Sequence, residues 1–164
     1  MADRNSDLSV RVSLLDRLLD DEPQTSREVP WDDVARMRII RRGIKRDLLD
    51  LLNTRFRCVA WQTELNELDE SLMNYGLPDF TAAGLNLAYD PDLLLQAIRR
   101  AIRMFEPRLA DVRVEALADS FHIDRTFRFR IDAVLLIEHQ RVPMQFDSTI
   151  ESRTGQFSIG ESAE

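Results

Sequence analysis

Residues 126–138 read TFRFRIDAVLLIE, and this stretch decides the fold class of the chain. Apolar side chains fall on every second position from Phe127 to Ile137, with Arg128 and Arg130 among the residues between them. A period of two is typical of a β-strand that packs one face on a core and turns the other face to water. We therefore expect Thr126 to Glu138 to form a half-buried strand.

The same alternation recurs before and after this strand. It runs through Val112 to Ala118, Val142 to Ile150 and, after a turn at Thr154-Gly155, Gln156 to Ile159. Strands that follow one another through short connections, without a crossover helix, pair antiparallel. The sequence therefore predicts a small, mainly antiparallel sheet of three to four strands.

Three helical segments are expected before the sheet. Apolar residues recur at helical spacing from about Leu8 to Asp20, from Asp32 to Asn53 and from Pro91 to Glu106. Asp32 and Asp90 are the expected N-caps, and Pro107 cannot continue the third helix. The chain is therefore predicted to be α+β, with an N-terminal helix and linker in residues 1–30 and the main α+β domain in residues 31–164.

The second helix has two contrasting faces. Its apolar stripe is formed by Val34, Met37, Ile40, Ile44, Leu48 and Leu51. Its opposite face carries Arg36, Arg38, Arg41, Arg42, Lys45 and Arg46. This basic face is either a solvated surface or a docking surface for an acidic partner, and the pattern alone leaves both interpretations open.

Two connecting segments between the second and third helices have recognisable character. Residues 54–63 mix charged with aromatic side chains and are expected to be a loop. Asn74 and Gly76 flank Tyr75, which predicts a left-handed turn where glycine avoids a Cβ clash. Pro78 holds the residue before it in an extended conformation. A rigid turn is therefore expected here.

Composition argues against several classes of function. A net charge of -7 is unlike that of a general nucleic-acid binder, whose surface is normally basic. The polar N-terminus has no signal core, and no apolar run approaches the roughly 20 residues of a membrane span, so a cytoplasmic protein is expected. Cys58 is the single cysteine, and His122 and His139 are not spaced as metal ligands. Without a glycine-rich phosphate-binding motif either, no cofactor or metal is expected.

The most informative polar cluster is Glu106-Pro107-Arg108. Because Pro107 ends the helix, Glu106 lies at a helix C-terminus, where the helix dipole disfavours a carboxylate by roughly 0.3–1 kcal/mol. Glu106 therefore needs a cation, which an arginine of the same chain or of another subunit can supply. Arg108 is too close in sequence to be assumed to be that partner.

A glycosidase would need a second carboxylate across a cleft from Glu106. Asp111, Asp119 and Asp124 follow it, but their pattern does not imply a sugar cleft, and the two tryptophans offer little stacking surface. The chain is therefore not expected to be an enzyme.

Several of these motifs occur together, and in order, in one known family. The chain resembles the TssE family of bacterial type VI secretion systems. The segments that carry the resemblance are Ser13–Leu18, Arg46-Asp47-Leu48, Asn74-Tyr75-Gly76-Leu77-Pro78-Asp79, Phe105-Glu106-Pro107-Arg108-Leu109 and Phe127-Arg128-Phe129-Arg130-Ile131. The likeness extends over nearly the whole chain.

The resemblance implies a structural baseplate component in the cytoplasm, docked at the inner membrane, that helps to initiate assembly of a contractile sheath. The implied partners are the wedge subunits TssF and TssG, the sheath proteins TssB and TssC, and TssK, with no nucleic acid and no insertion into the membrane. The resemblance also ties the Glu-Pro-Arg block to assembly. The expected protein-interface residues are Glu106, Pro107, Arg108, Asn74, Tyr75, Gly76, Arg128 and Arg130.

Open sheet edges invite a strand from another protein, so we also expect a sheath subunit to complete the sheet. Two alternatives from other classes stay open. One is a lysozyme-like peptidoglycan hydrolase, and the other is a stand-alone adaptor that binds proteins.

Overall fold

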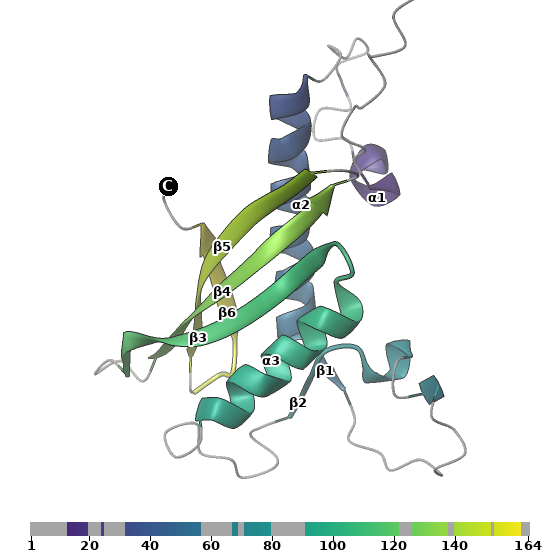
Figure 1. Ribbon diagram of the computed structural model, residues 1–164. Helices are drawn as coiled ribbons and strands as arrows, with labels where there is room; N and C mark the ends of the chain where they lie inside the picture. Colours follow the sequence, from purple (N-terminus) through teal and green to yellow (C-terminus); the bar gives the residue numbers. More distant parts are fainter. Residues whose placement is uncertain are drawn as a thin grey trace, which may run out of the picture.

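Four antiparallel strands, joined in sequence order, form the central sheet of the computed structural model (Figure 1). They are β3 (Leu109–Phe121), β4 (Thr126–Ile137), β5 (Gln140–Glu151) and β6 (Phe157–Glu161). The structure describes residues 13–19, 24, 32–56, 67–68, 71–79, 91–121, 126–137, 140–151 and 153–161. The predicted α+β class and antiparallel sheet are confirmed, although β3 is longer than the predicted strand from Val112 to Ala118.

One face of the sheet packs on the core, as the alternation in β4 predicts. Every second residue of β4 from Phe127 to Ile137 is buried. Strand β5 pairs with β4 along its whole length without a register shift, and it buries Met144, Phe146 and Ile150. A slip of one residue would turn all of these side chains to solvent, so burial specifies the register.

Helix α2 (Asp33–Asn53) supplies much of the opposing half of the core. Asp32 caps it by accepting a hydrogen bond from the backbone N–H of Ala35 at 2.7 Å, as predicted. The apolar stripe is buried from Ile40 onward, but Val34 is 67% exposed. The reason is visible in Figure 1, where the N-terminal part of α2 extends beyond the sheet.

Helix α3 (Pro91–Phe105) packs against β3 and contacts α2. It ends one residue before Glu106, as the proline at position 107 requires. The expected N-cap, Asp90, lies outside the described residues. None of the helices in the described ranges is long and apolar enough to cross a membrane.

The N-terminal helix differs from its prediction. Helix α1 (Leu14–Leu18) has 5 residues, and residues 8–12 of the predicted helix lie outside the described ranges. Its leucines do not form a buried face: Leu15 and Leu18 are exposed, whereas Asp16 is buried. An arginine of α2 is the reason for this inversion, as described below.

The prediction of a loop over residues 54–63 is wrong at its start. Strand β1 (Arg55–Phe56) pairs in parallel with β2 (Leu77–Pro78), while residues 57–63 lie outside the described ranges. This pairing joins segments more than 20 residues apart, so the local pattern of apolar residues does not predict it.

The predicted turn before β2 is confirmed. It follows a short 3-10 helix, η2 (Leu72–Asn74), and Gly76 has a φ of 113°. A Cβ at this position would collide with the carbonyl oxygen of Thr54, which instead accepts a hydrogen bond from the Leu77 backbone N–H at 2.9 Å. Glycine is therefore required both for the backbone conformation and for the close approach of the two segments.

Candidate functional site

The helix end at Glu106 is neutralised by its own sequence neighbour. Arg108 folds back across Pro107, and its Nε donates to Oε1 of Glu106 at 2.6 Å while its Nη2 donates to Oε2 at 2.5 Å. The backbone N–H of Arg108 also donates to Oε1, at 3.3 Å. The cation that the helix end needs is therefore Arg108, which sequence distance alone had argued against.

The turn between α3 and β3 makes this two-residue pairing possible. The N–H of Glu106 still bonds to the Ile102 carbonyl oxygen at 2.9 Å, and the Glu106 carbonyl oxygen accepts from the Leu109 N–H at 3.1 Å. Glu106 is 5% exposed, so its carboxylate needs the guanidinium to replace water. The hydrogen bonds that Arg108 donates to Glu106 are the main cause of the raised pKa of Arg108, and they outweigh the opposing effect of burial.

The ion pair extends into a network of five charged side chains. Arg108 Nη2 also pairs with Asp47 at 2.5 Å, Arg46 Nη2 pairs with the other oxygen of Asp47 at 2.9 Å, and the same nitrogen pairs with Asp16 at 3.0 Å. Negative and positive groups thus alternate from Asp16 on α1, through α2, to Glu106. We call these five residues the Glu106 network.

Arg46 is the central cation of this network. Burial alone would lower its pKa, but the hydrogen bonds that Arg46 donates to Asp47 and Asp16, with the negative charges of both, raise the pKa overall. Removing one member of a buried ion pair leaves the other member uncompensated, which is strongly destabilising. The network therefore holds α1, α2 and the turn after α3 in one specific arrangement.

The Asn74-Tyr75-Gly76 turn lies beside this network. The Tyr75 ring packs edge-on against Phe105, with 5.2 Å between ring centroids. Burial raises the pKa of Tyr75, and the carboxylates of Asp50, Asp47 and Glu106 raise it further. Two motifs about 30 residues apart are thus brought together at the C-terminal end of α3, while Asn74 itself bonds to the Leu68 carbonyl oxygen at 3.0 Å.

Arg128 and Arg130 lie elsewhere. Both project from the face of β4 that is turned away from the core, where Arg128 is exposed. Arg130 Nε donates to Oδ1 of Asp147, its cross-strand neighbour on β5, at 2.8 Å. The structure therefore brings six of the eight predicted interface residues to the region around the end of α3 and separates these two from it.

The geometry offers little support for acid catalysis at Glu106. Both of its carboxylate oxygens accept hydrogen bonds from Arg108. The nearest proposed second acid in sequence, Asp111, is exposed and pairs with Arg141 at 2.6 Å. Asp124 and the side chain of Asp119 lie outside the described part of the chain, as do Cys58, His122 and His139. Among the described residues, no three His, Cys, Asp or Glu side chains are grouped so as to hold a metal ion.

Sequence reasoning missed Asp16, Asp47 and Gly43. The available signals were an acid directly after Arg46 in an otherwise basic stretch, and a glycine in the middle of a long helix, where glycine is disfavoured by about 1 kcal/mol relative to alanine. A mid-helix glycine often marks a close approach, and here a Cβ at Gly43 would lie 2.7 Å from Oδ2 of Asp16.

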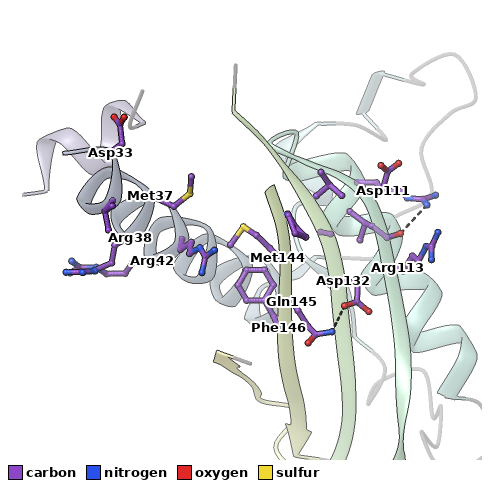
Figure 2. Close-up of a pocket in the computed structure, with 17 residues that line it drawn as sticks. Asp33, Met37, Arg38, Arg42, Asp111, Arg113, Asp132, Met144, Gln145 and Phe146 are labelled. Atoms are coloured by element: carbon purple, nitrogen blue, oxygen red, sulfur yellow. Dashed lines mark hydrogen bonds between the residues drawn. The ribbon is translucent and has the colours of Figure 1, made fainter. Parts of the chain in front are cut away.

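A hollow of about 1610 Å³ opens between the N-terminal half of α2 and the sheet (Figure 2). Met37 of α2 and Met144 of β5 point toward one another across it, and Phe146 lies beside them. Strand β6 pairs with β5 only from Phe146 to Ile150, and residues 140–144, nearly half of β5, have no strand on that side among the described strands. We call this space, which is lined by the N-terminal half of α2, by Arg103 of α3 and by residues of β3, β4 and β5, the β5 slot.

The sequence was compared with models of known protein families. A family model matches residues 39–140, more than half of the chain, including all of the Glu106 network except Asp16. The class of protein that it describes is a structural component of a baseplate. The chain belongs to the family of the baseplate wedge protein gp25. Searches of curated proteins and of solved structures gave no match.

Proposed function

We propose that this protein is the TssE-type subunit of a type VI secretion baseplate. In this role it joins the wedge with TssF and TssG, lies near TssK in the cytoplasm at the inner membrane, and provides the first attachment point for the TssB and TssC sheath. Membership of the baseplate wedge family supports a structural role among other baseplate proteins. The ordered motifs around Tyr75 and Glu106 favour the secretion-system branch.

The observation that carries this proposal is the open half of β5. Unpaired backbone groups at a sheet edge bind an incoming strand through main-chain hydrogen bonds, while the flanking side chains provide specificity. Residues 140–144 form such an edge, and two of them, Pro143 and Met144, also line the β5 slot opposite Met37. A strand supplied by a sheath protein would continue the line of β6 and cover these methionines.

The other two edges of the sheet are less suited to strand addition. On β6, the side chain of Asn53 accepts from the Phe157 N–H at 2.9 Å and donates to the Phe157 carbonyl oxygen at 3.1 Å, so it occupies the place of a neighbouring strand. On β3, the register shifts between Ala110 and Arg113, and Asp111 has a φ of 52°. Such bulges are a known means of blocking edge pairing.

The direction of the β5 backbone groups can be worked out from the hairpin. Glu151 donates its N–H to the Gln156 carbonyl oxygen at 3.0 Å, so the odd-numbered residues of β5 point their N–H groups toward the β6 side. Pro143 has the same parity, which fits an edge position because proline cannot donate to a ladder. The N–H of Arg141 therefore points away from β4, toward the side of β5 that β6 leaves uncovered.

This parity allows a sharp test of strand addition. Arg141→Pro removes a backbone donor on the side away from β4 and leaves the ladder to β4 intact, whereas Arg141→Ala removes only the side chain and its 2.6 Å bond to Asp111. We expect the alanine variant to support sheath assembly with TssF, TssG, TssB and TssC, and the proline variant to stop it. Normal assembly by a folded Arg141→Pro protein would overturn this account.

The region around the end of α3 is proposed as a second contact. Pro107 is exposed and the side chain of Arg108 is 29% exposed, so both can meet a partner while Glu106 holds the turn. Glu106→Arg would place a second cation beside Arg108 in the buried turn and should destabilise the isolated chain, because Glu106 forms an internal ion pair. Pro107→Asp, at an exposed position, tests the contact instead: it should weaken binding to TssF and TssG while the isolated chain keeps its fold. Asn74, Tyr75 and Gly76 belong to the same proposed contact, and Arg128 and Arg130 to a separate one on the open sheet face.

The proposed role requires no catalysis and no cofactor. A lysozyme-like activity would instead show turnover on peptidoglycan that is lost in Glu106→Gln. A stand-alone adaptor would bind a partner without entering a large particle. Sedimentation of the co-expressed baseplate proteins separates these alternatives from the proposed function.

A further inference from the structure

The exposure of α1 is the reverse of what its composition predicts. Leu14, Leu15, Leu18 and Leu19 are 76%, 54%, 80% and 52% exposed, whereas Asp16 is 6% exposed. A helix on a soluble protein normally turns its apolar residues to the core and its charges to water. Four leucines gathered on one short exposed element form the kind of apolar patch that marks a binding surface.

Gly43 and Arg46 of helix α2 form the binding position for the Asp16 carboxylate, which we call the Asp16 seat. This contact fixes the inverted orientation of α1. Gly43 is buried in the middle of α2, and a Cβ there would approach the two carboxylate oxygens of Asp16 to 2.7 and 2.9 Å. Arg46 pairs with one of these oxygens at 3.0 Å, and Ser13 Oγ donates to the other at 2.6 Å. The missing side chain at position 43 and the charge at position 46 together hold α1 by its aspartate, with the leucines left outside.

We propose that α1 is a docking element whose four leucines insert into an apolar groove of another baseplate protein. The inference rests on the proposed function as a baseplate subunit. Helix α1 lies outside the family match at residues 39–140, whereas Gly43 and Arg46 lie within it. The Asp16 seat is therefore provided by residues of the matched wedge domain.

A second copy of the chain is a poor fit as the occupant. Burying the four partly exposed leucines removes roughly 400–500 Å² of surface from water, while a stable interface buries about 800 Å² on each partner. Two copies would also each bring a net charge of -7. The patch therefore suits one part of a larger contact with a different protein.

The position of α1 indicates how that larger contact is made. Asp16 is one end of the Glu106 network, and Arg108, beside the proposed contact at the end of α3, is near the other. A wedge partner that binds the turn after α3 can therefore also reach α1, and the ion pairs keep the two surfaces in a constant relation.

The test uses the full-length protein co-expressed with TssF and TssG. Leu14→Ser with Leu18→Ser should leave the melting temperature of the isolated protein within about 2 °C of wild type, because both side chains are exposed. The same double variant should raise the Kd for the TssF–TssG complex by about 100-fold or more. The matched control, Leu93→Ser with Leu136→Ser, changes leucines that are 44% and 45% exposed elsewhere and should bind as wild type does.

The outcomes separate this inference from the proposed function. If wild type binds TssF and TssG and the α1 variant binds equally well, the docking role is wrong and the baseplate role stands. If wild type does not bind them, the baseplate role fails and the inference fails with it. A drop of more than about 5 °C in the melting temperature of the isolated variant would mean that the chain covers these leucines itself, and a wild-type dimer that the variant dissolves would assign them to a second copy. Either result overturns the proposal.

Discussion

The Glu106 network predicts an unusual order of stabilities in a double-mutant cycle. Arg108→Met keeps a long side chain but leaves two acids, Glu106 and Asp47, without the cation that lies between them. Glu106→Gln removes one charge and leaves Arg108 paired with Asp47. The double variant removes both the cation and the more deeply buried acid. We therefore expect Glu106→Gln to partly rescue Arg108→Met.

The magnitudes follow from burial. Breaking a buried pair by deleting one partner costs about 3–5 kcal/mol, and the 29% exposure of the Arg108 side chain places Arg108→Met at about 3 kcal/mol. Glu106→Gln retains the shape and an acceptor, so its cost is about 1–2 kcal/mol. The double variant should lose about 2 kcal/mol, which is less than Arg108→Met loses alone. For a chain of this length, 3 kcal/mol corresponds to a fall in melting temperature of about 6–12 °C.

Urea unfolding followed by circular dichroism measures these differences as shifts of the midpoint at a constant m-value. Arg141→Met is the matched control, because the Arg141–Asp111 pair is 64% exposed on both sides and should contribute less than about 1 kcal/mol. If the costs of the two single variants simply add in the double variant, the network is not energetically coupled and the reasoning fails.

Three further predictions concern the elements around the network. Gly76→Ala should destabilise the protein by about 3 kcal/mol or more in urea unfolding, because it combines a φ of 113° with a collision against the Thr54 carbonyl oxygen; a loss below about 1 kcal/mol would contradict this. Gly43→Ala should release α1, since the new Cβ takes the place of the Asp16 carboxylate, so hydrogen exchange at residues 14–18 should speed up while the core stays protected; unchanged exchange there would argue against the seat. The pKa of Tyr75 is raised above 10.0, so its contribution to folding stability is fully present below pH 10 and is lost as the pH rises through the folded-state pKa. The free energy of unfolding should therefore fall less steeply with pH in Tyr75→Phe, and an equally steep fall would show that another group causes it.

Local patterns were sufficient for most of the secondary structure. The alternation in residues 126–138 predicted both the strand and its buried face, because a period of two admits one core-facing set of side chains. The cap at Asp32 and the stop at Pro107 placed two helix boundaries within a residue, because capping and the missing proline N–H act over one turn.

Segments governed by long-range contacts were harder to predict. The parallel pairing of Arg55 with Leu77 depends on a glycine that lies against a carbonyl more than 20 residues away, so residues 54–56 looked like loop. The leucines of α1 looked like a buried stripe because spacing does not reveal that a glycine and an arginine on another helix will bury the aspartate between them.

In the candidate site, too, some features followed from local sequence and others from long-range contacts. Local rules were enough to show that Glu106 ends a helix and needs a cation, because a proline follows it and the helix dipole is unfavourable there. The folded chain was needed to show which cation this is, that Asp47, Arg46 and Asp16 continue the chain of charges, and that part of β5 has no neighbour beyond β6 among the described strands. Capping and strand period are local properties of the backbone, whereas ion pairs and sheet edges depend on which distant segments packing brings within a few ångströms of one another.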